Sequence, residues 1–215
     1  MQLPFMISFN QMTEKIKHRA STFERRKELV GITYRLIASR GLEGLRTRDV
    51  AEAAAIDTGT LHYHFPSKEL LIQAVIEHLN EEFRANRSER DNQPSSASDE
   101  LRDEVFDVVS RVQESPQQLV VMLDFVVRAS RDNAVAEILG RTQKEWNDSL
   151  AGLFRRGIEQ GLFRSDVHPG TGASLLRAQL IGLAMVSLMA PAQARDLASA
   201  LLAQLQSWLA KPRTT

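Results

Sequence analysis

The stretch TGTLHYHFPSK, residues 58–68, gathers the side chains of this sequence that are best able to do chemistry. It holds two histidines, a tyrosine and a lysine. Histidine at this density can ligate a metal ion, act as a catalytic base, or belong to a binding surface. Which of the three applies depends on how the chain positions the rings.

A metal site is the least favoured of these three interpretations. His62 and His64 are two residues apart, and Pro66 disfavours a strand. On a helix this spacing turns the two side chains by about 200°, whereas ligands on one helix need a spacing of three or four residues. No cysteine is present and no acidic residue lies between the histidines. We therefore predict no metal site and no cofactor.

Catalysis is also disfavoured, because the sequence shows no Ser-His-acid grouping and no glycine-rich phosphate loop. We predict that the chain is not an enzyme and has no catalytic residue, although reactive residues converging from distant positions remain an alternative. Binding is the remaining interpretation of the histidine-rich stretch.

The distribution of charge favours a polyanionic partner. The net charge of the 215 residues is zero, but residues 1–68 hold 11 Lys and Arg against 7 Asp and Glu, and residues 69–215 hold 16 against 20. The basic excess therefore lies in one compact segment, where it supports nucleic-acid binding. The lack of cysteine, of a signal peptide and of about 18 unbroken apolar residues leads us to expect a cytoplasmic protein without a membrane partner.

Nearly every segment has the periodicity of a helix, and we find no strand. In the first part we predict helices over 23–40, over 47–54 with Thr47 as N-cap, and over 58–65, followed by a longer helix capped by Ser67. The polar stretch 87–100 marks a boundary. Beyond it, helices begin near Ser96 and Ser115, and others cover 134–160, 169–190 and the C-terminal segment. The predicted fold is all-α, with a small N-terminal unit and a larger C-terminal bundle.

The two short helices have the layout of a helix-turn-helix, with a turn at 55–57 and a longer helix on each side. On a helical wheel, Leu61 and Phe65 fall together and face the core. The outward face then carries Gly59, Thr60 and Tyr63, flanked by His62 and His64, and Lys68 follows at a helix start that attracts phosphate. A merely solvated face is the alternative, but it must explain Thr, Tyr and His in place of Lys and Glu.

The run TRDVAEAAAIDTGTLHYHFPSKELL closely resembles the DNA-binding domain of the TetR/AcrR family of bacterial transcriptional regulators. ITYRLIASRGLEGLRT is similar too, and the likeness covers roughly residues 23–75; later residues match mainly in helix order and in RRGIEQGLFRSD. The resemblance implies a helix-turn-helix domain over 23–68, a connecting helix and linker over 69–94, and a ligand-binding and dimerisation domain over 95–215. We expect a flexible arm over 1–22.

By this resemblance the DNA contacts are expected at the positions that match the family's motif. They are Thr47, Arg48, Thr58, Gly59, Thr60, His62, Tyr63, His64 and Lys68, with Thr60 offering a hydroxyl and a methyl group. His62 stands where the family often has tyrosine. The basic residues Lys15, Lys17, Arg19 and Arg25 are either solvated or contact the DNA backbone.

A single short recognition helix reads few base pairs, so helix-turn-helix proteins usually bind palindromes as dimers. We predict a dimer interface of Leu176, Leu180, Leu183, Leu201, Leu205 and Trp208; the alternative is that these stripes only fill the core of one protomer. Candidate pocket residues for a small-molecule effector are Phe106, Met122, Phe125, Trp146, Phe154, Gln179 and Met185, each of which could instead be plain core.

The function that the resemblance implies is a ligand-responsive repressor. It would bind a palindromic operator in double-stranded DNA as a homodimer and be released by a small-molecule inducer. The alternative is a helical DNA-binding regulator that acts as an activator or without a ligand. A helical adaptor that binds only protein would not need Arg48 and Lys68 beside the exposed Thr, Tyr and His face.

Overall fold

The structure is a computed structural model that describes the backbone of residues 5–91 and 96–210 and the side chains of residues 22–82 and 96–210. Within those ranges the chain forms helices and no strand, which confirms the all-α prediction. The helices are α1 (Phe5–Arg40), α2 (Thr47–Ala53), α3 (Thr58–His64), α4 (Lys68–Asp91), α5 (Ala97–Glu114), α6 (Pro116–Ala129), α7 (Asn133–Glu159), α8 (Pro169–Met189) and α9 (Pro191–Leu209). They divide into two compact units, Met1–His78 and Leu79–Thr215, so the division falls inside α4.

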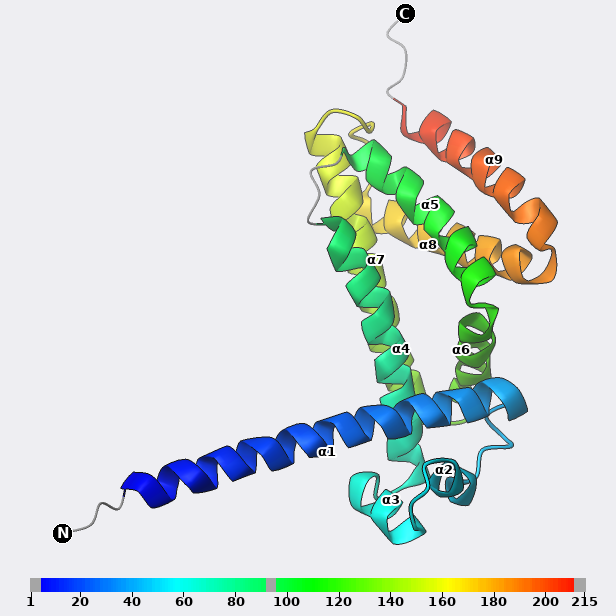
Figure 1. The fold of residues 1–215 in the computed structure, drawn as a ribbon. Coiled ribbons are helices and arrows are strands. Elements are labelled where there is room, and N and C mark those ends of the chain that lie inside the picture. The colour runs from blue at the N-terminus through cyan, green and yellow to red at the C-terminus, as the bar shows by residue number, and fades with distance from the viewer. Residues whose placement is uncertain (1–4, 92–95, 211–215) are drawn as a thin grey trace, which may run out of the picture. The chain divides into compact units, whose positions relative to one another are not determined.

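The first unit contains α1, the two short helices and the first part of α4 (Figure 1). α1 ends at Gly41, whose φ is 73° and whose amide donates to the Ile37 carbonyl at 2.8 Å, so the predicted stop is confirmed. The predicted start at Phe23 is wrong, because α1 begins at Phe5. No Gly or Pro interrupts residues 5–22, and the helix continues through them.

The predicted N-terminal arm thus falls partly on α1 and partly on residues 1–4, which lie outside the described residues. The side chains of Lys15, Lys17 and Arg19 are also outside them, so their proposed contacts with DNA stay a prediction.

Two predicted helix caps are confirmed. The Leu70 amide donates to Ser67 Oγ at 3.2 Å before α4, and the Asp99 amide donates to Ser96 Oγ at 3.2 Å before α5.

Two other predicted caps are wrong. Ser115 precedes Pro116 at the start of α6 but makes no capping hydrogen bond with its side chain. Arg46, not Thr47, occupies the N-cap position of α2, again without a side-chain cap. In both places the residue type favoured a cap that the backbone does not use.

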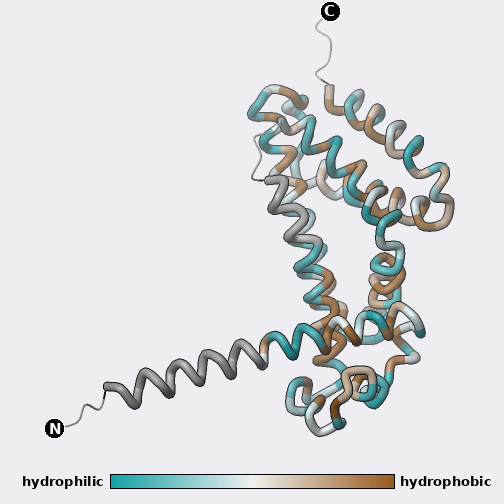
Figure 2. The backbone as a smooth tube through the Cα atoms, viewed as in Figure 1, coloured by the Kyte–Doolittle hydropathy of each residue, from teal (hydrophilic) through white to brown (hydrophobic). Residues whose placement is uncertain are grey.

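In the second unit, α5, α7, α8 and α9 share one apolar core, and hydrophobic and hydrophilic residues alternate along α5, α7 and α9 (Figure 2). Two glycines leave room for aromatic rings there. A Cβ on Gly157 would lie 2.1 Å from the Phe163 ring, and one on Gly172 would lie 2.6 Å from the Phe154 ring. The core therefore depends on glycine at both positions.

α8 has two apolar sides. Among the helices of the described ranges it is long and apolar enough to cross a membrane by length and composition, although Arg177 and Gln179 interrupt it. One side carries buried leucines of the core, whereas Leu175, Ile181 and Met189 are exposed.

Candidate nucleic-acid interface and internal cavity

The turn between α2 and α3 is fixed by its own backbone. The Ala55 amide donates to the Glu52 carbonyl and the Ile56 amide to the Ala51 carbonyl, each at 3.0 Å. Ala55 has a φ of 52°, in the left-handed region that residues with a Cβ enter at a cost. The turn is thus only a few residues long, and it places Asp57 at the N-cap position of α3.

Asp57 organises the first turn of α3. Its Oδ1 accepts from the Thr60 amide at 2.9 Å, and its Oδ2 accepts from the Thr60 hydroxyl at 2.7 Å. These two hydrogen bonds, the side-chain one first, lower the pKa of Asp57, so its carboxylate is charged at neutral pH. The Thr60 hydroxyl proton is therefore committed to Asp57, and toward a ligand Thr60 presents its oxygen lone pair and its methyl group.

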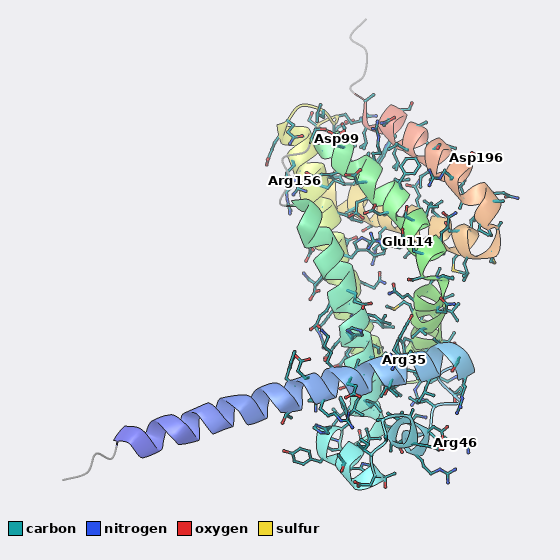
Figure 3. All side chains as sticks on the ribbon, in the orientation of Figure 1. Arg35, Arg46, Asp99, Glu114, Arg156 and Asp196 are labelled. Atoms are coloured by element: carbon teal, nitrogen blue, oxygen red, sulfur yellow. The ribbon has the colours of Figure 1, made fainter. Side chains whose placement is uncertain are left out.

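Most of the predicted DNA-contacting residues lie on the surface of the helix-turn-helix. Tyr63 is 68% exposed. The others that are exposed or half-buried are Thr47, Arg48, Thr58, Gly59, Thr60, His62 and Lys68. Sequence reasoning missed Arg46, which is exposed and projects from the start of α2 (Figure 3); its place beside Thr47 and Arg48 was the available signal.

The predicted position of His64 is wrong. It was expected on the outward face, but its side chain is only 8% exposed. Its ring meets the Tyr63 ring edge-on at 5.1 Å, and its backbone carbonyl accepts a hydrogen bond from Arg26. Burial, followed by the positive charges of Arg26 and Arg25, lowers the pKa of His64 and favours the neutral ring.

The physical reason is that α1 packs over the end of α3 and covers the side that the helical wheel left open. Arg25 donates to the Ala54 carbonyl at 3.1 Å, and the Arg26 guanidinium lies 4.2 Å above the Phe65 ring. Arg25 therefore stabilises the helix-turn-helix through a hydrogen bond to the end of α2. Leu61 and Phe65 are buried, as predicted.

His62 is exposed while His64 is buried, so the two rings lie in different surroundings, as their spacing predicts; the absence of a metal site stays a prediction. Across the residues whose side chains are described, no three His, Asp or Glu side chains gather as metal ligands would.

The second unit contains a cavity of about 240 Å³. Helices α4 to α8 all contribute to its wall, which is mostly apolar. Of the predicted pocket residues, Met122, Trp146 and Met185 line it. Its polar wall residues, which sequence reasoning missed, are Asn80, Glu104, Arg111, Ser115, Gln118, Thr142 and Gln143.

The other predicted pocket residues lie elsewhere. Phe125 and Phe154 are fully buried, Phe106 packs against the main core, and Gln179 is half-buried outside the cavity wall. Large apolar side chains were chosen from sequence, but the largest of them fill the core and leave no space beside them.

The predicted dimer residues also need correction. Leu176, Leu180, Leu183, Leu201 and Leu205 are buried in the core of the protomer, and Trp208 packs against Phe154 with ring centroids 6.2 Å apart. The five leucines are therefore core residues, as the alternative predicted, whereas Trp208 is only partly buried and its part in a dimer interface stays a prediction. The large apolar residues that α8 and α9 expose are Leu175, Ile181, Met189 and Leu197.

Both parts of the chain match known families. Residues 32–75 match the sequence profile of the bacterial regulatory proteins of the tetR family. Residues 97–207 match the profile of the C-terminal part of BetI-type transcriptional repressors. The second match alone spans more than half of the chain.

Individual relatives agree with these profiles. The HTH-type transcriptional repressor KstR2 of Rhodococcus jostii is 29% identical over 163 residues, which is 71% of this chain and 74% of the relative. The HTH-type transcriptional regulator UidR of Escherichia coli is 25% identical over 173 residues, 80% of this chain and 84% of the relative. A crystal structure of a TetR-family regulator from Rhodococcus sp. superposes with a TM-score of 0.76 at 27% identity, covering 87% of this chain and all of that one. The chain belongs to the TetR family of bacterial transcriptional regulators and is a transcriptional repressor.

Proposed function

We propose that this repressor binds a palindromic operator as a homodimer, with α3 of each protomer in the major groove. The observation that carries the proposal is the outward face of α3, where the exposed Tyr63 stands beside Gly59, Thr60 and His62. These side chains can reach base edges and sugars, and the glycine leaves room for a close approach. A regulator of this kind works beside the chromosome, in the cytoplasm.

Cationic groups around that face are placed to bind phosphate. Arg46 and Arg48 are exposed at the start of α2, and Lys68 opens α4, where free backbone amides add to its charge. Two carboxylates of the motif are already engaged, because Asp49 accepts from Arg40 at 3.0 Å and Asp57 caps α3. Arg46, Arg48 and Lys68 are therefore the cations that we expect to contact the phosphates.

The dimer interface that we propose uses the exposed sides of α8 and α9. Leu175, Ile181 and Met189 of α8 and Leu197 of α9 are large apolar side chains in contact with solvent. A Cβ on Gly182 would meet no atom within 4 Å, so a second helix can approach α8 closely at that point. A symmetric four-helix arrangement of two α8–α9 pairs would cover these residues.

Release would follow from a shift between two conformations. An effector that fits the cavity only when the protomer holds the low-affinity conformation raises the population of that conformation. No chemical step is needed, and the effect is limited by the difference between the effector's affinities for the two conformations.

The test is operator binding by the full chain, measured by fluorescence anisotropy on DNA from upstream of its own gene at two salt concentrations. We expect salt-sensitive binding, because phosphate contacts release counterions. Tyr63→Ala and Lys68→Ala should each weaken binding by roughly ten-fold or more, as expected for the loss of about 1–3 kcal/mol per contact.

Lys144→Ala is the matched control. Lys144 lies on α7, is 77% exposed and pairs with Asp148, so its loss should leave operator affinity unchanged. Circular dichroism establishes that each variant is folded. Full operator affinity in both Tyr63→Ala and Lys68→Ala would contradict the proposed contact surface.

A further inference from the structure

Asn80 lines the cavity, and its side chain has a hydrogen-bond acceptor without a donor. The side chain is 3% exposed, and its Oδ1 is enclosed without a hydrogen bond among the described residues. An enclosed carbonyl oxygen with no donor is disfavoured, because it lost its hydrogen bonds with water and gained none. Asn80 therefore has an unmet requirement that a bound molecule can satisfy.

The network around Asn80 fixes which end of the amide is unpaired. The Thr142 hydroxyl donates its single proton to the Ile138 carbonyl at 3.1 Å, so its oxygen can only accept from Asn80. Nδ2 of Asn80 makes that bond, at 2.5 Å. The unpaired atom is therefore the carbonyl oxygen, which accepts a proton from an O–H or N–H group.

Beside Thr142, four further polar side chains of the wall have their own partners. Arg177 donates to Gln143 Oε1 at 2.7 Å, and Gln118 donates to Glu82 at 3.1 Å. Arg111 pairs with Asp107 at 3.8 Å, and Glu104 is engaged as well. None of these groups needs a bound molecule to complete its interactions.

The rest of the wall restricts the charge and size of a ligand. Most of it is apolar, with the Trp146 ring and the flexible Met122 and Met185 side chains. Its two charged residues, Glu104 and Arg111, are of opposite sign, so neither an anion nor a cation is favoured overall. A volume of about 240 Å³ lies just below the usual range of small-molecule sites, which starts near 300 Å³.

We propose that the effector is a small, neutral and largely apolar molecule with one hydroxyl or N–H group, which donates to Oδ1 of Asn80. This inference rests on the proposed function, in which a ligand in this cavity releases the operator. Ethers and ketones would bring a second acceptor to Asn80, and a carboxylate would add a negative charge to a wall that already holds Glu104. Asn80 thus selects donors.

The experiment compares pairs of ligands in which a methyl group replaces the donor hydrogen, using isothermal calorimetry on the full chain without DNA. The pairs are naphthol with methoxynaphthalene and indole with N-methylindole, which separate an O–H donor from an N–H donor. Naphthoate and choline test an anion and a cation. We expect at least one donor ligand to bind roughly ten-fold tighter than its methylated partner, the value of one buried hydrogen bond.

Asn80→Leu should abolish that preference and bring the ratio within each pair to about one, while apolar binding persists. The variant should fold, because it removes an unpaired buried acceptor, and Thr142, which loses the bond from Nδ2, keeps its own hydrogen bond to the Ile138 carbonyl. Asn147→Leu is the matched control. Asn147 lies on α7 outside the cavity wall, where it accepts from Ser174 at 3.1 Å, and the variant should keep the preference.

Equal affinities within both pairs, a preference for naphthoate or choline, or no binding of either donor would each overturn the inference. So would a donor preference that survives in Asn80→Leu, since the donor would then bind elsewhere. Operator binding is measured separately. A chain that binds its operator but shows no donor preference contradicts this inference alone, whereas one that shows the preference but binds no operator contradicts the proposed function.

Discussion

Two enclosed polar atoms of the described residues have no hydrogen-bond partner, and each compact unit contains one of them: Nδ1 of His64 and Oδ1 of Asn80. Their surroundings differ. The His64 ring meets the Tyr63 ring edge-on, and burial, followed by the charges of Arg26 and Arg25, lowers its pKa. Asn80 instead borders a cavity.

The same deficiency therefore has two consequences. An imidazole can limit the cost of burial by remaining neutral, so His64 needs no ligand and couples the fold to pH. An amide cannot titrate, so Asn80 stays unsatisfied until a donor enters the space beside it. An unpaired buried atom indicates a ligand site only where an adjacent cavity can admit the ligand.

The largest change in stability should come from introducing a negative charge at Asn80, beside the cavity. Asn80→Asp places a carboxylate where the described wall offers no unengaged cation. We expect the free energy of unfolding to fall by about 3 kcal/mol at neutral pH, as for other unpaired buried charges.

Burial raises the pKa of the introduced carboxyl above its unfolded value of about 3.9. The destabilisation is therefore full at neutral pH and shrinks as the pH falls through the folded pKa. Urea denaturation at neutral and mildly acidic pH measures both, with Asn80→Leu as the uncharged control. A stable, pH-independent Asn80→Asp protein would mean that this atom is accessible to solvent.

A smaller change in stability is expected when His64 is protonated at acidic pH. Its folded pKa lies below the ordinary value of 6.5, so below about pH 6.5 the unfolded chain binds the proton first. Stability of the first unit should fall with decreasing pH, by at most about 1.4 kcal/mol per pH unit for a single proton, and be unaffected at higher pH. Urea denaturation across this range checks the sign.

His64→Phe should flatten that dependence and keep operator affinity within about two-fold, because the ring is buried and its backbone carbonyl still accepts from Arg26. His62→Phe is the control for stability; since His62 is exposed, that variant should retain the acid dependence. A large loss of operator affinity in His64→Phe would restore His64 to the DNA-contacting set.

The smallest expected change in stability comes from substitutions in the turn between α2 and α3. It would show which unfolding transition belongs to the first unit. Ala55→Gly relieves the left-handed φ of 52° and should stabilise the first unit by about 0.5 kcal/mol, after the added entropy of the unfolded glycine. Ala53→Gly, at the last residue of α2, has no left-handed φ to relieve and should not stabilise it. Calorimetry should show only the transition of the first unit moving. Equal shifts in both transitions would mean that the units unfold together.

The two units also differ in how well sequence predicted them. Along α3, residue type and spacing placed Leu61 and Phe65 inside and Tyr63 outside, because a short helix on a small core has one buried side. His64 was misplaced because its cover comes from Arg25 and Arg26, which are distant in sequence and entered no helical wheel.

In the second unit the same method identified helices but not their surfaces. α8 is apolar on two sides, so its leucine stripe at 176, 180 and 183 could not show which side meets the protomer's own core. The cavity was equally hidden, because it exists where packing fails, and no local pattern encodes a failure of packing. Asn80 was the available signal, because it follows the buried Ile72 and Ile76 at the helical spacing of four residues.

The hydrogen bond between Thr60 and Asp57 also bears on the operator sequence. In the proposed complex Thr60 approaches base edges with its proton already donated to Asp57 Oδ2. It can accept from the amino group of adenine or cytosine, or pack its methyl against that of thymine. The major-groove edge of guanine presents the acceptors O6 and N7, for which Thr60 has no donor. The base pair that meets Thr60 should therefore turn a base other than guanine toward it, in both halves of the palindrome.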